Sequence, residues 1–231
     1  MDKDVLAALA GKFIVFDGVD GAGKGAQIRL LTEALEARRM GHVSTRDPGG
    51  TTIGDRIRHV LLDYDLSQMD IRCETLLFMA SRAQLVRDVV RPALAKNATC
   101  VCDRFVSATC AYQGAAGADV RAILELAKYA VGECWPHLTI VIDLPVEVGF
   151  DRTGRKPGPR KKAGGEGQFR LFHDTHEDAM EARPLDFHQN VRQRFLELST
   201  YYPAPIAVVD GHGSVEEVRT RVMDALAHAF C

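Results

Sequence analysis

The stretch that most constrains this chain is a glycine-rich segment, FDGVDGAGKGAQ, at residues 16–27. An apolar run at 13–16 leads into the segment, and Ile28, Leu31 and Leu35 follow it at helical spacing. The run predicts a buried parallel strand, and the spacing predicts a helix. A strand that enters a helix through a glycine loop is typical of a phosphate-binding P-loop.

The loop fits the pattern GxxxxGK through Gly18, Gly23 and Lys24. Glycines let backbone N–H groups close around phosphate oxygens, while the lysine supplies a cation; the alternative is a glycine-rich turn with a solvated lysine. P-loops usually continue with Ser or Thr, whose hydroxyl binds magnesium, but this chain has Gly25 and then Ala26. Magnesium must therefore be held by other groups or through water.

Composition and charge favour an ordinary globular protein. The chain has 231 residues, of which 46% are hydrophobic and 26% are charged, and this suits one α/β domain over 1–231. The formal net charge of −2 provides no global field that would capture nucleic acid, so we expect no nucleic-acid partner. Any anion site must use locally placed arginines.

The chain is expected to be cytoplasmic, without a membrane partner. Its first 11 residues are too short and too acidic for a signal peptide, and no apolar run approaches the length of a membrane span. Six cysteines occur without a CxxC pair. We expect them to be reduced and mostly buried.

Apolar runs predict four more strands, which alternate with helical patterns. This alternation predicts an α/β fold with a five-stranded parallel sheet and helices on both faces. Together with the glycine loop it indicates a P-loop NTPase fold. The basic, Gly/Pro-rich run at 154–170 is expected to be a mobile surface segment. The further strands are expected at 42–46, 98–104, 138–143 and 206–209. Long helical regions are expected at 70–97, 119–132, from about 178, and at 214–229.

Charged side chains stand at the ends of predicted strands. Arg46 ends one strand, and Asp103 with Arg104 ends another. Open parallel sheets bind ligands at this edge, so phosphate and metal binding is one interpretation. The alternatives are a surface arginine and a simple Asp–Arg salt bridge. Within the helical region, Phe78 would by default lie in the core and Arg82 would extend to water.

Several motifs, in the same order along almost the whole chain, resemble the thymidylate kinase family, P-loop enzymes that phosphorylate dTMP. FDGVDGAGKG resembles the P-loop of the family, and TRDPGGTTIGDRIR resembles its REPGGT loop and helix. ETLLFMASRAQ resembles the base-binding helix, and CDRFVSATCAYQG the DR(Y/F)…AYQ segment. IDLPVEVGFDR resembles the strand and helix that lead into the lid of the family, which implies a mobile lid at about 150–178.

The resemblance implies a site for ATP with Mg²⁺ and a site for dTMP. Asp20 would lie near the acceptor sugar and, with Asp103, near the metal. The dTMP phosphate would be held by Arg46, Arg82 and Arg104. The implied ATP-binding positions are Gly18, Gly21, Ala22, Gly23, Lys24, Gly25 and Ala26.

For the nucleoside part of dTMP, the resemblance implies that Phe78 stacks on thymine and that Thr109 and Gln113 lie near its polar edge. Tyr112 would lie under the deoxyribose, where it disfavours a 2′-hydroxyl. The implied acceptor-binding positions are Asp20, Arg46, Phe78, Arg82, Arg104, Thr109, Tyr112 and Gln113.

Family members take a catalytic arginine from either the P-loop or the lid, and here the loop position is Ala22. The lid is therefore expected to supply it through Arg152 or Arg155, with Arg160 a weaker candidate. The implied catalytic residues are Lys24, Arg104, Arg152 and Arg155. The resemblance also implies a homodimer.

The sequence departs from the family pattern at Gly25, Ala26, Ala108, which replaces a serine, and Ala179, which replaces an arginine. These departures leave two alternatives open. One is a related kinase for another nucleotide or a deoxynucleoside. The other is a nucleotide-binding regulatory protein of the same fold with little turnover.

Overall fold

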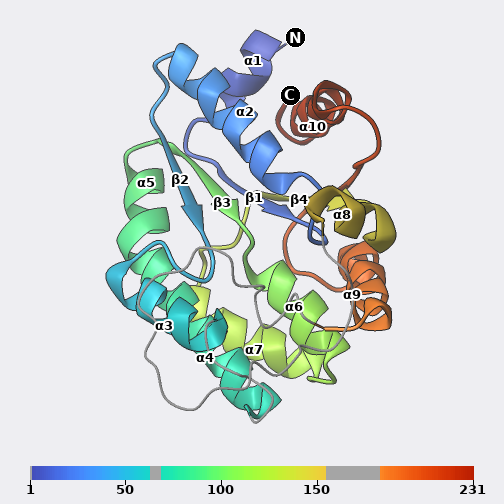
Figure 1. Cartoon of the computed structure of the whole chain (residues 1–231). Helices are drawn as coiled ribbons and strands as arrows, with labels where there is room; N and C mark the ends of the chain where they lie inside the picture. The colour runs from blue at the N-terminus through green and yellow to red at the C-terminus, as the bar shows by residue number, and fades with distance from the viewer. Residues whose placement is uncertain (1, 63–68, 155–182) are drawn as a thin grey trace, which may run out of the picture.

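The computed structural model describes residues 2–62, 69–154 and 183–231 (Figure 1). Its five strands form one parallel sheet in the order β2-β3-β1-β4-β5, which confirms the predicted five-stranded parallel sheet. The strands are β1 Phe13–Asp17, β2 His42–Arg46, β3 Thr99–Asp103, β4 Leu138–Asp143 and β5 Ile206–Asp210.

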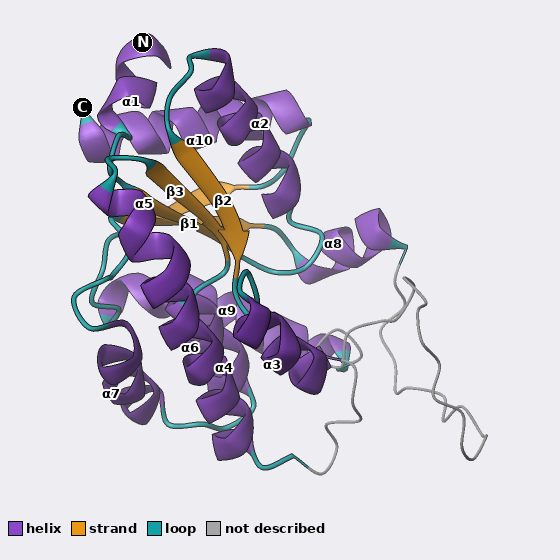
Figure 2. Ribbon diagram, turned by 90° about the vertical axis from the view of Figure 1, so that its left-hand side faces the viewer, coloured by secondary structure: helices purple, strands orange, loops and turns teal. Residues whose placement is uncertain are grey.

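Helices cover both faces of the sheet, as Figures 1 and 2 show. Helices α1, α2 and α10 lie on one face, with the two termini close together, while α4, α6, α7 and α9 lie on the other. The helices are α1 Asp2–Ala8, α2 Lys24–Ala37, α3 Thr52–Leu62, α4 Ile71–Leu85, the π-helix Val86–Val90, α5 Arg91–Ala95, α6 Val106–Ala115, α7 Val120–Val131, α8 Val146–Thr153, α9 Leu185–Glu197, the 3-10 helix Leu198–Thr200 and α10 Val215–Phe230.

The central strand β1 contributes to two apolar cores. Phe13 and Val15 pack in the core beneath α4, α6 and α7, whereas Ile14 and Phe16 pack in the core beneath α2 and α10. All four side chains are fully buried. Successive side chains of a strand point to opposite faces, so a continuous apolar run is what a sheet covered on both faces requires.

Most predicted helices match the structure to within a few residues. Asp119 caps the N-terminus of α7 by accepting a hydrogen bond from the backbone of Arg121. Ser214 and Glu217 form a capping box at the start of α10, which is a strong start signal. The long helical region at 70–97 is one continuous run of α4, the π-helix and α5 that ends at Ala95.

Two regions of the chain differ from the sequence expectations. The first residues, considered only as a possible signal peptide, form helix α1. The helix expected from about 178 begins, within the described residues, at Leu185. Of the expected lid, only the end of α8 and Gly154 belong to the described residues; the remainder, including Arg155, Arg160 and Ala179, lies outside them.

The carboxyl ends of three strands meet at one edge of the sheet. Register pairs Arg46 with Asp103, and Asp103 with Phe16. The backbone N–H of Asp47 donates to the Asp103 carbonyl at 3.0 Å, which continues the alignment beyond β2. This edge therefore collects the charged residues that follow the apolar strands.

All six cysteines are free thiols, as expected, and four are buried. No helix in residues 2–62, 69–154 or 183–231 combines the length and apolar character needed to cross a membrane.

Candidate active site

The glycine loop joins β1 to α2 in a left-handed backbone conformation at three glycines. Gly18, Gly21 and Gly23 have φ of 130°, 75° and 97°. A Cβ at Gly18 would lie 2.4 Å from the carbonyl oxygen of Ile142, whereas a Cβ at Gly23 would meet nothing within 4 Å. Gly18 is thus required by the neighbouring strand, while Gly23 leaves the backbone open to a ligand at the start of α2.

Lys24 is the first residue of α2 and is buried. Its ammonium donates to the carbonyls of Gly18 at 3.1 Å and Val19 at 3.0 Å, and lies 4.0 Å from the Asp20 carboxylate. Burial lowers the pKa of Lys24, and the nearby Arg104 charge acts in the same direction. The loop therefore holds its cation inside the turn that would surround a phosphate group.

The same loop packs directly on helix α8. A Cβ at Gly21 would lie 2.1 Å from the carbonyl oxygen of Gly149, and a Cβ at Gly149 would lie 2.3 Å from the carbonyl oxygen of Asp20. These distances are shorter than any van der Waals contact. The absence of side chains at Gly21 and Gly149 is what lets α8 touch the P-loop.

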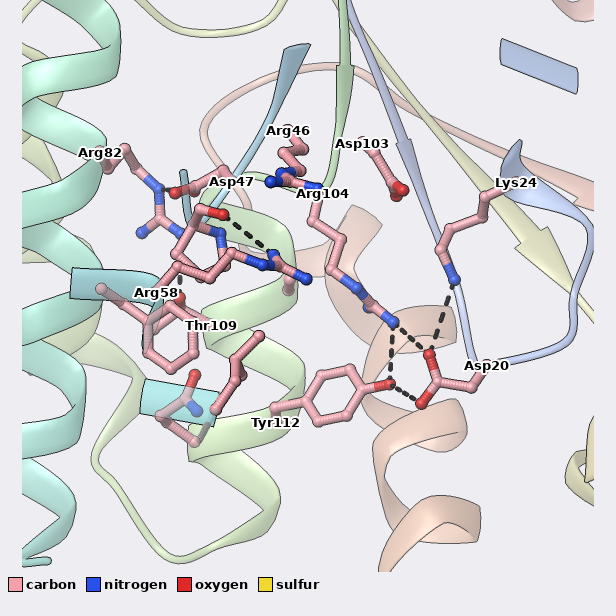
Figure 3. Close-up of a pocket in the computed structure, with 15 residues that line it drawn as sticks. Asp20, Lys24, Arg46, Asp47, Arg58, Arg82, Asp103, Arg104, Thr109 and Tyr112 are labelled. Carbon is pink, nitrogen blue, oxygen red and sulfur yellow. Dashed lines mark hydrogen bonds and ion pairs between the residues drawn. The ribbon is translucent and has the colours of Figure 1, made fainter. Parts of the chain in front are cut away.

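Arg104 occupies the centre of the site. Its backbone has a φ of 67°, which is uncommon for a residue with a side chain and marks a tightly constrained position. Its guanidinium donates to Asp20 at 2.6 Å, to the Tyr112 hydroxyl at 3.2 Å and to the Gly18 carbonyl at 3.3 Å. The Tyr112 hydroxyl also donates to Asp20 at 3.2 Å, which closes a triangle of contacts (Figure 3).

Asp17 lies beneath this network at the end of β1, fully buried. The hydroxyl of Ser107 donates to one carboxylate oxygen, and the Arg104 guanidinium lies 3.5 Å from the other. Burial raises the pKa of Asp17 to about 6, although the charge of Arg104 and the Ser107 hydrogen bond act in the opposite direction. Asp17 thus provides Arg104 with a buried carboxylate partner in addition to Asp20.

A second buried ion pair lies on the other side of the site. Arg82 is 1% exposed, and its Nε donates to the Asp47 carboxylate at 2.6 Å. The same guanidinium donates to the Phe105 carbonyl at 3.0 Å and to the Thr109 hydroxyl at 3.1 Å. Burial raises the pKa of Asp47, against the opposing effect of the Arg82 charge. Arg82 is therefore fixed by partners in the loop after β2, directly before α6 and within α6, rather than extended into water.

One pocket of about 280 Å³ is lined by Lys24, Arg82 and Arg104 together with Asp20 and Asp47. In Figure 3, Arg46, Arg58 and Arg82 lie on one side and Lys24 with Asp20 on the other, while Arg104 extends between them. The predicted site residues that line this pocket are Asp20, Lys24, Arg46, Phe78, Arg82, Asp103, Arg104, Thr109, Tyr112 and Gln113.

Comparison with known proteins assigns the family. A profile described as thymidylate kinase matches residues 16–222. The chain belongs to the thymidylate kinase family. Among the relatives named thymidylate kinase, that of Citrifermentans bemidjiense is 41% identical over 94% of this chain and 91% of its own length. Those of Syntrophotalea carbinolica and Kosmotoga olearia are 39% and 40% identical, over 94% and 91% of this chain and 96% and 93% of their own lengths.

In this member of the thymidylate kinase family, Arg152 is the predicted lid arginine that belongs to the described residues, and it does not line the pocket. Arg152 is exposed on α8 and donates to the Gly211 carbonyl at 3.3 Å; it lies one turn beyond Gly149, the residue that touches the P-loop. Arg155 lies outside the described residues. The position that carries an arginine in some thymidylate kinases, Ala22, is buried at 1% exposure.

Sequence reasoning missed four charged residues in or beside the site. Asp47 and Arg58 line the pocket, whereas Asp17 and Glu74 are buried and lie outside its lining. Arg58 lines the pocket and donates to the Pro48 carbonyl at 3.0 Å. The sequence did contain an indication of this position. Arg58 precedes Leu62, another lining residue, by four positions, and this spacing puts both side chains on the same face of α3. Asp17 and Asp47 each directly follow or end a strand, the position that made Asp103 a candidate.

Proposed function

We propose that this chain transfers the terminal phosphoryl group of ATP to dTMP, which gives ADP and dTDP. The observation that carries the proposal is the gathering of Arg46, Arg58, Arg82 and Arg104 in the pocket that Lys24 also lines. Both substrates are anions, and transfer requires that they be brought into line while charge spreads over the moving group. The pocket provides that positive charge.

The acceptor needs orientation more than activation. The second pKa of a phosphate monoester is about 6, so the dTMP phosphate is already an anionic nucleophile near neutral pH. We assign the acceptor phosphate to Arg46, Arg82 and Arg104. Thymine would stack on Phe78, and the deoxyribose would lie on Tyr112, whose hydroxyl contacts Arg104 and Asp20.

Mg²⁺ is the proposed cofactor, bound together with ATP. Asp20 and Asp103 line the pocket, and one Asp103 carboxylate oxygen is buried without a hydrogen-bond partner among the described residues. Mg²⁺ typically takes one or two carboxylates together with substrate phosphates and waters, so this pair fits. No set of three His, Cys, Asp or Glu side chains in the described chain could hold a metal alone. When bound, the ion would offset phosphate charge.

We further propose that residues 1–231 act as one kinase domain whose lid, at about 150–178, supplies Arg152 or Arg155 to the transferring group. The functional unit is proposed to be a homodimer. The cytoplasm is the proposed location, since ATP is the donor and all six cysteines are free.

The deciding experiment is a coupled assay of ADP release with dTMP, dUMP, dCMP, AMP and thymidine as acceptors. The proposal expects the highest kcat/KM with dTMP. A preference for another acceptor would support the related-kinase alternative. ATP binding by calorimetry without turnover on any acceptor would support the regulatory alternative. Arg104→Lys tests the site itself, with an expected loss of at least about a hundredfold in kcat/KM for dTMP.

A further inference from the structure

A buried carboxylate behind the pocket contacts one of its lining residues. Glu74, on α4, is 2% exposed, and Gln113, on α6, is 1% exposed. The Gln113 side-chain amide donates from Nε2 to Glu74 Oε1 at 2.7 Å. Gln113 lines the pocket, whereas Glu74 does not belong to the lining residues within the described chain.

A second partner orients the Glu74 carboxylate. The guanidinium of Arg183 lies 3.5 Å from Glu74 Oε2, and it also lies over the Phe187 ring at 4.6 Å from the centroid. Each carboxylate oxygen therefore has its own donor, Gln113 at Oε1 and Arg183 at Oε2. An ionised carboxylate can only accept hydrogen bonds.

This arrangement fixes the polarity of the Gln113 amide. An amide group has one donor end and one acceptor end, and the choice between them is decided by its partners. Because Glu74 accepts only, the NH₂ of Gln113 must face it. The carbonyl oxygen is then the end of the amide that Gln113 can offer to a ligand.

The neighbouring Thr109 has a partner that only donates hydrogen bonds, whereas the partner of Gln113 only accepts them. Its hydroxyl oxygen accepts from the buried guanidinium of Arg82 at 3.1 Å, and a guanidinium only donates. The hydroxyl proton of Thr109 is thus left to point away from Arg82. Thr109 and Gln113 both line the pocket, and we call this pair the polar wall. The polar wall therefore combines a donor on Thr109 with an acceptor on Gln113.

We propose that Glu74 is a positioning residue that sets base preference by holding Gln113 with its carbonyl toward the acceptor. Thymine presents an imide N–H beside a carbonyl oxygen, which complements an acceptor beside a donor. Cytosine presents a ring nitrogen that accepts beside an amino group that donates, which is the reverse pattern. The inference rests on the proposed function, since it requires that the acceptor base lies against the polar wall.

The principal variant is Glu74→Gln, which preserves shape but has only one acceptor oxygen for two donors. Either Arg183 or Gln113 then faces an NH₂ group, and Gln113 is free to turn its own NH₂ toward the base. We expect the ratio of kcat/KM for dTMP to that for dCMP to fall about tenfold, mainly through KM for the acceptor. The KM for ATP is expected to stay unchanged.

Two further variants separate positioning from simple loss of stability. In the Gln113→Leu background, Glu74→Gln is expected to change the ratio no further, because its effect passes through Gln113. Glu125→Gln, at an exposed carboxylate paired with Lys128 on α7, is the matched control and should leave the ratio unchanged. Calorimetric Kd values for dTMP and dCMP without ATP give a readout independent of turnover.

If the wild type prefers dTMP but Glu74→Gln leaves the ratio of kcat/KM for dTMP to that for dCMP unchanged, this inference is wrong while the proposed function stands. Equal losses for both acceptors, or an effect that persists fully in the Gln113→Leu background, would also overturn the inference. Wild-type enzyme without activity on dTMP would overturn the proposed function and this inference together.

Discussion

At the scale of single residues, the titration of Asp17 makes the stability of the folded chain depend on pH. Its pKa rises from 3.8 to about 6 in the folded chain. The folded state therefore binds its proton more tightly than the unfolded state does, and this contribution to stability is complete below pH 3.8 and is lost as pH rises through about 6. The two pKa values differ by the equivalent of about 3 kcal/mol.

The variant Asp17→Asn should remove this pH dependence. We expect the free energy of unfolding of the variant, relative to wild type, to increase by about 2 kcal/mol between pH 4 and pH 7, because Asp17 is already partly ionised in the unfolded chain at pH 4. Denaturant titrations at a series of pH values measure it. Asp224→Asn, at an exposed position on α10, controls for the loss of one carboxylate. Parallel pH profiles for wild type and Asp17→Asn would contradict the assignment.

The pair formed by Arg82 and Asp47 makes a second prediction. Arg82→Met leaves the Asp47 carboxylate buried without its cation, so we expect the free energy of unfolding to fall by about 3 to 5 kcal/mol. Adding Asp47→Leu to Arg82→Met should recover part of that loss. The exposed pair of Arg29 and Glu33 provides the control, since Arg29→Met is expected to cost less than about 1 kcal/mol.

If the double variant of Arg82 and Asp47 is as unstable as Arg82→Met alone, the loss does not come from the unpaired carboxylate. Denaturant midpoints at one pH are sufficient to compare the variants.

Sequence reasoning identified the arginines of the site better than their acidic partners. Arg82 and Arg104 stood in recognisable motifs, and both line the pocket. Asp47 and Glu74 lie in the same motifs, but a carboxylate on a helix or loop is ordinarily a solvated surface group. Only burial, which the sequence does not display, turns these two carboxylates into partners that fix the site.

At the scale of elements, α8 depends on its glycine contact with the P-loop. Gly149→Ala would place a Cβ 2.3 Å from the Asp20 carbonyl, so α8 must shift away from the loop. We expect a loss of about 1 to 3 kcal/mol in the free energy of unfolding, together with a fall in kcat. Gly41→Ala is the control, because its Cβ would meet Ala98 at an ordinary 3.5 Å. A fully active and stable Gly149→Ala variant would refute the prediction.

The proposed lid arginines make another prediction at this scale. Arg152 follows Gly149 by one helical turn, and its hydrogen-bond partner among the described residues is the Gly211 carbonyl at 3.3 Å. If a lid arginine stabilises the transferring group, Arg152→Ala, Arg155→Ala or the double variant should lose kcat by at least about a hundredfold while ATP affinity changes little. Steady-state kinetics with calorimetric ATP binding measures both quantities. Unchanged kcat in all three variants would exclude the role.

Elements with strong periodicity and clear caps were predictable. All five strands and helices α7 and α10 follow apolar patterns and capping residues such as Asp119 and Ser214. The π-helix between α4 and α5 was not predictable, because its apolar pattern differs little from that of an α-helix over one turn. Helix α1 is only seven residues long, too short to be stable without the partners it packs against.

At the scale of the whole molecule, the proposed homodimer is testable. Large apolar side chains are exposed on two adjacent helices, with Ile53 on α3 and Leu76 on α4 each 52% exposed. We expect sedimentation at micromolar concentration to give twice the chain mass of 25.4 kDa. Leu76→Glu should shift the protein toward one chain if this face is covered. Leu126→Glu on α7 is the control, and a wild-type monomer would contradict the proposal.

The direct contact between Gly21 and Gly149 also restricts how sequences of this kind can diverge. Neither position can acquire a side chain while the other element stays in place, because each Cβ would lie within about 2.5 Å of the facing backbone. A substitution at one glycine would survive only alongside a compensating displacement of α8. We therefore expect substitutions at residues 21 and 149 to be correlated across relatives. The pair of residues found at these two positions would then indicate how closely the P-loop and α8 approach each other.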